Sequence, residues 1–156
     1  MTNSFTGQGA FKGSGKIALG SQTPAPPAKP SVSGGTLTSD STYYYRTFNA
    51  SDTLTISNNS LSADILVIGG GGSNPGNGGG GGGAGGIAYV SGSSLAAASY
   101  TVSVGSAGSN SSFTDGTNTI TAYAGGAGGT YSGGSASSGG SGGGGSGRLS
   151  VSGAVI

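Results

Sequence analysis

The stretch DILVIGGGGSNPGNGGGGGGAGGIAYV, residues 64–90, decides how this sequence folds. Four of its first five residues are apolar, which is typical of a strand buried on both faces. The next 18 residues, 69–86, include 13 glycines. These glycines are either a flexible tether between two structured parts or a structural element in their own right.

The position of this stretch favours the second interpretation. It lies inside a series of short strands, where a long loop without structure is uncommon in a compact domain. Glycine can adopt an extended threefold helix of polyproline II geometry, and without Cβ atoms several such helices can lie side by side and hydrogen-bond. We therefore predict that residues 69–86 and much of 125–147 are ordered and packed on one another or on a sheet. Exposed flexible loops are the alternative.

From residue 36 onward the pattern is that of β-strands. Leu54 and Ile56 alternate with polar residues, and Tyr100, Val102 and Val104 do the same. Asp115-Gly116 is a turn signal between two further strands. No segment has a helical period with caps. The predicted fold is all-β: a β-sandwich-like domain with glycine-rich segments, in polyglycine II form, packed between its strands.

The N-terminal part divides into an arm and a linker. Residues 1–21 contain two F-x-G-x-G units with Phe5 and Phe11, followed by Ile17 and Leu19. This segment is either a frayed tail or an extended attachment arm whose four apolar side chains dock into a neighbouring subunit. Residues 22–35 include TPAPPAKP, a composition that favours a semi-rigid polyproline II spacer. Residues 36–156 form the predicted glycine-rich β domain.

Composition excludes several classes of function. Of 156 residues, 38 are glycine and 6% are charged; the net charge is +1, and Cys, His, Trp and Glu are absent. A near-neutral chain gives no electrostatic reason to bind nucleic acid, and no apolar run is long enough for membrane insertion or a secretory signal. Without His, Cys or Glu, the usual nucleophile–base pairs and zinc sites cannot be built. We expect no catalysis and no cofactor or metal.

The seven tyrosines are the side chains best suited to binding. Tyr43, Tyr44 and Tyr45 are adjacent and cannot share one face of a strand, so at least one is expected to be exposed. Tyr131 lies within the second glycine stretch. Together with Asn74 and Asn77 it is the candidate for receptor-facing loops, because Tyr, Asn and Ser make adaptable contacts. The alternative is that the tyrosines cover the sheet and fill space over glycine.

Several blocks in order resemble the glycine-rich domain of bacteriophage tail fibre and virion structural proteins, especially those of cyanophages. They are FNASDTLTISNNSLSADILVIGGGG, a glycine run, SYTVSVGSAGSNSSF, ITAYAGGAGG and a closing SGAVI, within residues 37–156. In the arm, GSGKIALG is similar to attachment sequences of such proteins. The family's last strand usually continues beyond the point where this chain stops, at Ile156.

The resemblance implies a virion component located on the extracellular particle and assembled in the host cytoplasm. The leading hypothesis is a non-enzymatic tail fibre or fibre-tip protein, bound to other virion proteins by its arm and facing a host surface glycan or protein. The alternatives are a capsid decoration protein and, as a minor possibility, a cellular surface-coat or ice-binding protein. We expect a homotrimer with contacts through TYYYRTF (42–48) or RLSVSGAVI (148–156).

Overall fold

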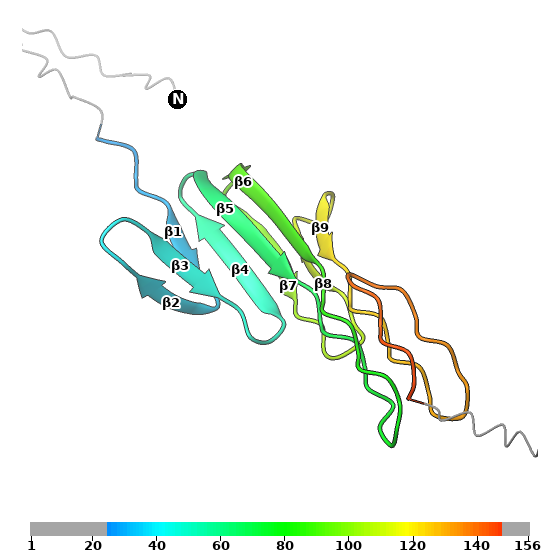
Figure 1. Ribbon diagram of the computed structural model, residues 1–156. Coiled ribbons are helices and arrows are strands. Elements are labelled where there is room, and N and C mark those ends of the chain that lie inside the picture. Colours follow the sequence, from blue (N-terminus) through cyan, green and yellow to red (C-terminus); the bar gives the residue numbers. More distant parts are fainter. Residues whose placement is uncertain (1–24, 148–156) are drawn as a thin grey trace, which may run out of the picture.

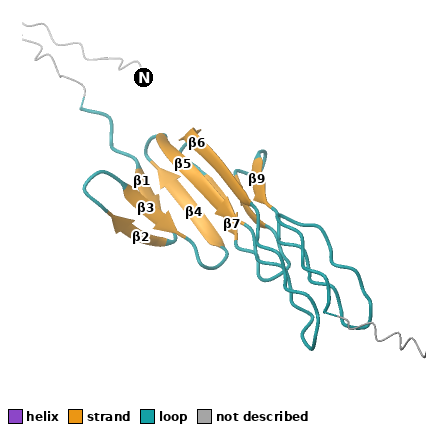
Figure 2. Cartoon of the chain, viewed as in Figure 1, coloured by secondary structure: helices purple, strands orange, loops and turns teal. Residues whose placement is uncertain are grey.

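The computed structural model describes residues 25–147, and these residues form strands and loops without a helix (Figure 2). All strand pairs in this range are antiparallel. The all-β prediction is therefore confirmed. The strands are β1 Ser31–Ser33, β2 Thr36–Ser39, β3 Tyr44–Thr47, β4 Asp52–Ser57, β5 Leu61–Ile68, β6 Ile87–Leu95, β7 Ser99–Ser103, β8 Ser111–Thr114 and β9 Thr119–Ala122.

The strands form one larger sheet and two hairpins (Figure 1). The sheet has five strands in the order β1-β4-β7-β8-β9, and the hairpins are β2–β3 and β5–β6. Arg46 in β3 ties the first hairpin to the sheet, because its guanidinium donates hydrogen bonds to the carbonyl oxygens of Val32 and Gly34. The predicted Asp115-Gly116 turn joins β8 to β9. In this turn the Asp115 N–H donates to the backbone carbonyl oxygen of Asn118 at 3.3 Å.

The core lies between the five-stranded sheet and one face of the β5–β6 hairpin. Its buried side chains are Leu54, Ile56, Leu95, Tyr100 and Val102, and Leu61, Ala63 and Ile65 of β5 pack against them. The alternating positions in β4 and β7 thus point inward, as the sequence pattern predicts. The Tyr100 ring stacks on Phe113 at a centroid distance of 5.3 Å. Such side chains each contribute about 1.5–3 kcal/mol when fully buried, so this small core holds the domain only modestly.

The prediction that residues 64–68 are buried on both faces is wrong. Val67 is buried, but Leu66 is 60% exposed and Ile68 is 56% exposed. The reason is that β5 lies in a two-stranded hairpin whose inner face covers the core, while no described element covers its other face. Leu66 pairs with Tyr89 and Ile68 with Ile87, so these four exposed residues form an apolar outer face of the hairpin.

The two glycine stretches continue from the strand ends as five extended segments that run side by side (Figures 1 and 2). We number these glycine segments I (69–75), II (78–86), III (123–130), IV (134–140) and V (141–147), and together they form the glycine bundle. The β7–β8 loop joins it, because Gly108 donates to the Gly71 carbonyl at 2.7 Å and Gly70 to Ser109 at 3.0 Å.

Hydrogen bonds within the glycine bundle repeat every three residues. Between segments II and III, the N–H groups of Gly80, Gly83 and Gly86 donate to the carbonyl oxygens of Gly129, Gly126 and Tyr123, each at 2.8 Å. Between segments V and II, the N–H groups of Ser141, Gly144 and Gly147 donate to the carbonyl oxygens of Ala84, Gly81 and Gly78, again at steps of three residues. This period of three differs from the period of two in a β-strand.

Segment III is hydrogen-bonded to four neighbouring segments. It bonds segment I through Gly125 and Gly128, segment V through Gly126 and Gly129, and it also accepts bonds from segments II and IV. A β-strand has at most two hydrogen-bonded neighbours, one on each side, whereas segment III has four. The prediction that the glycine stretches are ordered and hydrogen-bonded to one another is confirmed for the described residues.

Close packing explains why glycine is required at these positions. A Cβ atom on Gly128 would lie 1.8 Å from the Gly80 carbonyl oxygen, and one on Gly125 would lie 2.0 Å from the Gly83 oxygen. Apart from Tyr123 and Thr130 at its two ends, segment III has two non-glycine residues, Ala124 and Ala127, which lie three residues apart and are less buried than the glycines between them. Segment III therefore has one open side.

Candidate binding site at the tip of the glycine bundle

The candidate receptor-facing residues lie in two turns at the end of the glycine bundle farthest from the strands (Figure 1). One turn includes the end of segment I, with Asn74, and the residues that join it to segment II, with Asn77. The other joins segments III and IV and contains Tyr131. All three side chains are exposed. We call this pair of turns the tip.

The first turn is fixed by its own polar groups. The Asn74 Oδ1 accepts the Gly76 N–H at 2.8 Å, and the Gly76 carbonyl accepts the Gly79 N–H at 2.8 Å. The backbone has a positive φ at Gly76 (74°), Asn77 (24°) and Gly78 (74°). Such angles suit glycine and asparagine, which explains these residue types in the turn. Asn74 therefore has a structural role in the turn.

The second turn is closed around Thr130. Its Oγ1 accepts the Gly134 N–H at 2.8 Å, its N–H donates to the Gly134 carbonyl at 3.0 Å, and its carbonyl accepts the Gly133 N–H at 3.0 Å. Gly133 has a φ of 101°, which the turn requires. Tyr131 lies at the corner of this turn and is 57% exposed.

The structure brings the two turns together. A Cβ atom on Gly78 would lie 2.7 Å from Cδ2 of Tyr131, so the ring rests on the backbone of the first turn. Gly78 also accepts the Gly147 N–H at 3.2 Å, which ties the end of segment V to the same place. The result is a fixed surface with an aromatic ring, two amide side chains and no carboxylate. Such a surface can stack on a ligand and hydrogen-bond to it.

The carboxylates of the described residues outside the tip serve local structure. The Tyr45 hydroxyl donates a hydrogen bond to Asp40 at 2.6 Å. This bond is the main reason that the pKa of Asp40 is lowered, and it raises the pKa of Tyr45. In β5, the Gly92 N–H and then the Tyr89 hydroxyl lower the pKa of Asp64, which in turn raises the pKa of Tyr89.

In the β8–β9 turn, the Asn118 and Thr117 N–H groups lower the pKa of Asp115. Among residues 25–147, no three acidic, His or Cys side chains gather where they could hold a metal ion. The same residues include no helix with the length and apolarity needed to cross a membrane.

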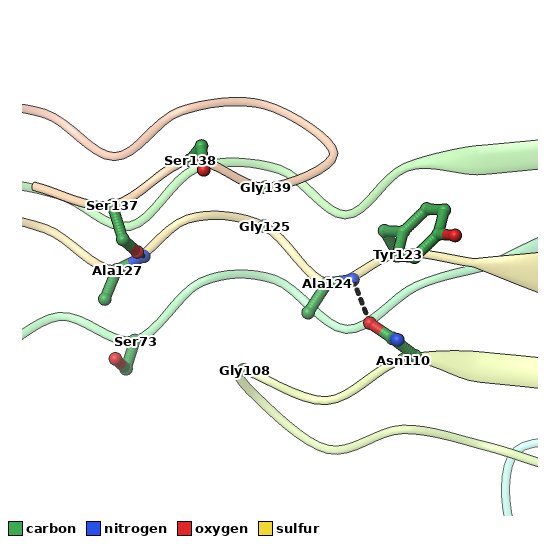
Figure 3. A pocket seen from close by; sticks show the side chains of 10 residues that line it. All are labelled: Ser73, Gly108, Asn110, Tyr123, Ala124, Gly125, Ala127, Ser137, Ser138 and Gly139. Carbon is green, nitrogen blue, oxygen red and sulfur yellow. Dashed lines mark hydrogen bonds between the residues drawn. The ribbon is translucent and has the colours of Figure 1, made fainter.

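A groove on the side of the glycine bundle is a candidate site that the sequence does not predict (Figure 3). Tyr123 and Asn110 lie in it beside the open side of segment III. Both residues occur in segments that the sequence assigns to the β domain, but nothing in the sequence indicates that the two meet. The sequence signal that could have located the groove is the three-residue spacing of Ala124 and Ala127. These alanines mark the side of segment III that no other described segment covers.

Some predicted residues cannot be placed. Phe5, Phe11, Ile17 and Leu19 of the arm lie outside the described residues, and so does the closing stretch RLSVSGAVI. In the TYYYRTF stretch, Tyr43, Tyr44 and Tyr45 are all exposed, so the expectation that at least one would be exposed is confirmed. They lie in and beside β3, at the end of the strand region away from the tip (Figure 1).

The antiparallel strands, the hydrogen-bonded glycine segments and the exposed tip define a glycine-rich, all-β protein. The chain matches the family described as "Glycine-rich domain" over residues 46–155, which is 110 of its 156 residues. The protein belongs to this family. The match begins in β3 and includes every glycine segment of the bundle. No curated protein and no solved structure matched the chain.

Proposed function

We propose that the protein is a non-enzymatic structural component of a bacteriophage particle, in a tail fibre or fibre tip, and that its tip attaches to a host cell. The observation that carries this proposal is the position of the tip. The described chain begins at residue 25 at one end of the molecule, and the two turns lie at the opposite end (Figure 1). A protein anchored by the segment before residue 25 would therefore present Asn74, Asn77 and Tyr131 outward.

The hydrogen-bonded glycine bundle supports this role, because it makes the tip a fixed surface. A ligand then binds without the entropic cost of ordering two long loops. We propose that the segments are polyglycine II helices beside a β-sandwich-like domain, since their bonds repeat every three residues. Backbone φ and ψ near −75° and +145°, measured by nuclear magnetic resonance, would test the helix type.

The proposal includes partners on both sides of the molecule. The arm, with Phe5, Phe11, Ile17 and Leu19, binds other virion proteins, and the tip faces a host surface glycan or protein. The protein forms a homotrimer within the extracellular particle. The apolar outer face of the β5–β6 hairpin supports self-association, because exposed apolar side chains gathered on one sheet face mark interaction surfaces.

The experiment compares host adsorption of particles that carry variants of the tip. Tyr131→Ala and Asn77→Gly remove the side chains and leave the turns intact, since glycine accepts the positive φ of residue 77. We expect adsorption to fall at least tenfold. Tyr44→Ala is the matched control, because Tyr44 is 83% exposed at the other end of the molecule. Normal adsorption of both tip variants, on particles that contain them, would refute the attachment role.

A capsid decoration protein is the second candidate, and the apolar outer face of the hairpin favours it as well. A decoration protein covers neighbouring subunits with a broad apolar surface and leaves adsorption unchanged when its tip is altered. Electron cryo-microscopy of intact particles would distinguish the two functions. Density for this protein on the capsid shell, rather than on the tail or its fibres, would assign it to decoration.

A further inference from the structure

The groove on the side of the glycine bundle has the size of a ligand site. It is open to solvent and has a volume of about 550 Å³, within the usual range of about 300–1,000 Å³ for such sites. Its walls come from the β7–β8 loop and from segments I, III and IV (Figure 3). The groove differs from the tip, because its lining residues include Tyr123 and Asn110 and exclude Tyr131 and Asn77.

The floor of the groove holds its polar side chains in fixed orientations. Ala124 donates its N–H to Asn110 Oδ1 at 2.8 Å (Figure 3). Ala127 donates its N–H to Ser137 Oγ at 2.8 Å. Since Oδ1 must meet the N–H donor, the Asn110 Nδ2 is directed away from this bond, with two protons to donate. The Ser137 hydroxyl, which accepts from Ala127, still has its own proton to donate.

Tyr123 supplies an aromatic surface at the edge of the groove. Tyr123 is 66% exposed, although its backbone is held in place by the Gly86 N–H, which donates to its carbonyl at 2.8 Å. The ring therefore stands on a rigid support and leaves its faces open. An exposed tyrosine offers a large apolar contact together with a polar hydroxyl, at a low cost in side-chain entropy.

The charge of the groove restricts its ligand. The lining consists of glycine, alanine, serine, asparagine and tyrosine, with no ionisable group of opposite sign to pair with a charged ligand. A charged group that enters such a site loses hydration without compensation. The remaining features are a flat aromatic surface and several fixed donors. They are complementary to a molecule that has one apolar face and many hydroxyl groups.

We propose that this groove binds a neutral saccharide, with a sugar ring stacked on Tyr123 and its hydroxyl groups bonded by Asn110 Nδ2 and the Ser137 hydroxyl. This site is separate from the tip and does not depend on the proposed role in host attachment. A proline-rich peptide could also lie in a groove with one aromatic residue. The fixed donors favour the saccharide, because proline carries no hydroxyl groups for them to bind.

The experiment uses the full chain on an array of immobilised oligosaccharides. The neutral members contain glucose, galactose, mannose or N-acetylglucosamine, and the acidic members are their sialylated counterparts. We expect neutral members to retain the protein. The free form of the strongest neutral ligand is then titrated into ¹⁵N-labelled protein, where the amide signals of Ala124 and Ala127 should shift.

Matched variants assign the binding to the groove. Tyr123→Ala and Asn110→Asp should each weaken binding at least tenfold. The aspartate still accepts the Ala124 N–H but lacks the amide donor, so the floor stays intact. Tyr123→Phe should keep most of the binding because it keeps the ring, and Tyr131→Ala at the tip should leave binding unchanged.

Three outcomes would overturn the proposal. One is that no neutral oligosaccharide is retained at millimolar concentration. Another is that binding is the same in Tyr123→Ala and Asn110→Asp as in the natural sequence, or is lost in Tyr131→Ala instead. The third is that a peptide with the sequence of residues 23–30 binds the groove and the oligosaccharides do not. None of these results depends on where the protein lies on a particle.

Discussion

Individual glycines differ in how much space surrounds them, although the sequence shows them as one uniform run. In segment III the Cβ position of Gly128 falls on the backbone of segment II, whereas in segment V a Cβ atom on Gly142 would meet nothing within 4 Å. Neither glycine has a positive φ, so strain in the backbone does not distinguish them. Packing alone separates an essential glycine from a replaceable one.

This difference predicts opposite results for two substitutions of the same kind. Gly128→Ala should lower the free energy of unfolding by about 1–3 kcal/mol, as overpacked interiors do. Gly142→Ala should change it by less than about 0.5 kcal/mol, as exposed substitutions do. Urea unfolding followed by circular dichroism would measure both. Equal effects of the two substitutions would contradict the close packing of segments II and III.

The sequence predicts the existence of the glycine bundle better than its internal arrangement. The number of glycines and their place between strands indicate that residues 69–86 are ordered. The side of each segment that faces inward depends on contacts with residues far away in the chain, such as Gly80 with Gly128. The same holds for the site, since Asn77 and Tyr131 are predicted as exposed loop residues but their proximity is a tertiary feature.

At the scale of the elements, the β8–β9 turn links stability to pH. Hydrogen bonds from the Asn118 and Thr117 N–H groups hold the pKa of Asp115 below its ordinary value of 3.8. A carboxylate with a lowered pKa in the folded state stabilises the fold above the unfolded pKa. This contribution is lost as the pH falls through the folded pKa. Asp40 and Asp64 act in the same direction.

We therefore expect the free energy of unfolding to decrease as the pH falls from 5 to 2, and to decrease less in Asp115→Asn. Asparagine at position 115 keeps an oxygen acceptor for the two N–H groups but does not titrate. Urea unfolding at several pH values, for both proteins, measures the difference. Parallel curves for the two proteins would show that Asp115 does not contribute to the pH dependence.

The β5–β6 hairpin shows where an apolar run misleads. The sequence predicts a strand at DILVI, and the structure confirms it, but a continuous apolar pattern does not say what covers each face. Here the core covers one face, and the outer face with Leu66, Ile68, Ile87 and Tyr89 is exposed among the described residues. Apolar residues on an open face are therefore an indication of association rather than of burial within the domain.

The outer face predicts that association depends on the hairpin. Leu66→Thr combined with Ile87→Thr should shift the protein toward the monomer at micromolar concentration, while threonine keeps a high preference for strands. Sedimentation velocity would measure the distribution of species. Tyr131→Ala, at an exposed position of the tip outside the expected trimer contacts, is the control. If the double variant and the control associate as the natural sequence does, the trimer contact lies elsewhere.

For the whole molecule, the anchor and the folded domain should be separable. Residues 28 and 29 are hydrogen-bonded to the folded domain, because the Asn59 and Asn58 side chains donate to the carbonyl oxygens of Ala28 and Lys29. Deletion of residues 1–27 leaves these bonds in place. We expect the shortened protein to unfold at the same urea concentration as the full chain but not to enter particles. Normal incorporation into particles would show that the arm is not the anchor.

The three-residue repeat of the glycine bundle also limits how its length can change. In the polyglycine II helix that we propose for these segments, one residue inserted into segment III would rotate all following residues by a third of a turn and turn the methyl groups of its alanines into the neighbouring backbones. Three inserted residues restore the phase and lengthen that segment by about 9 Å. A change of reach would thus require matched additions of three in adjoining segments. In related chains, the distance from strands to tip should therefore vary in discrete steps, while the turns between segments are free to differ in sequence.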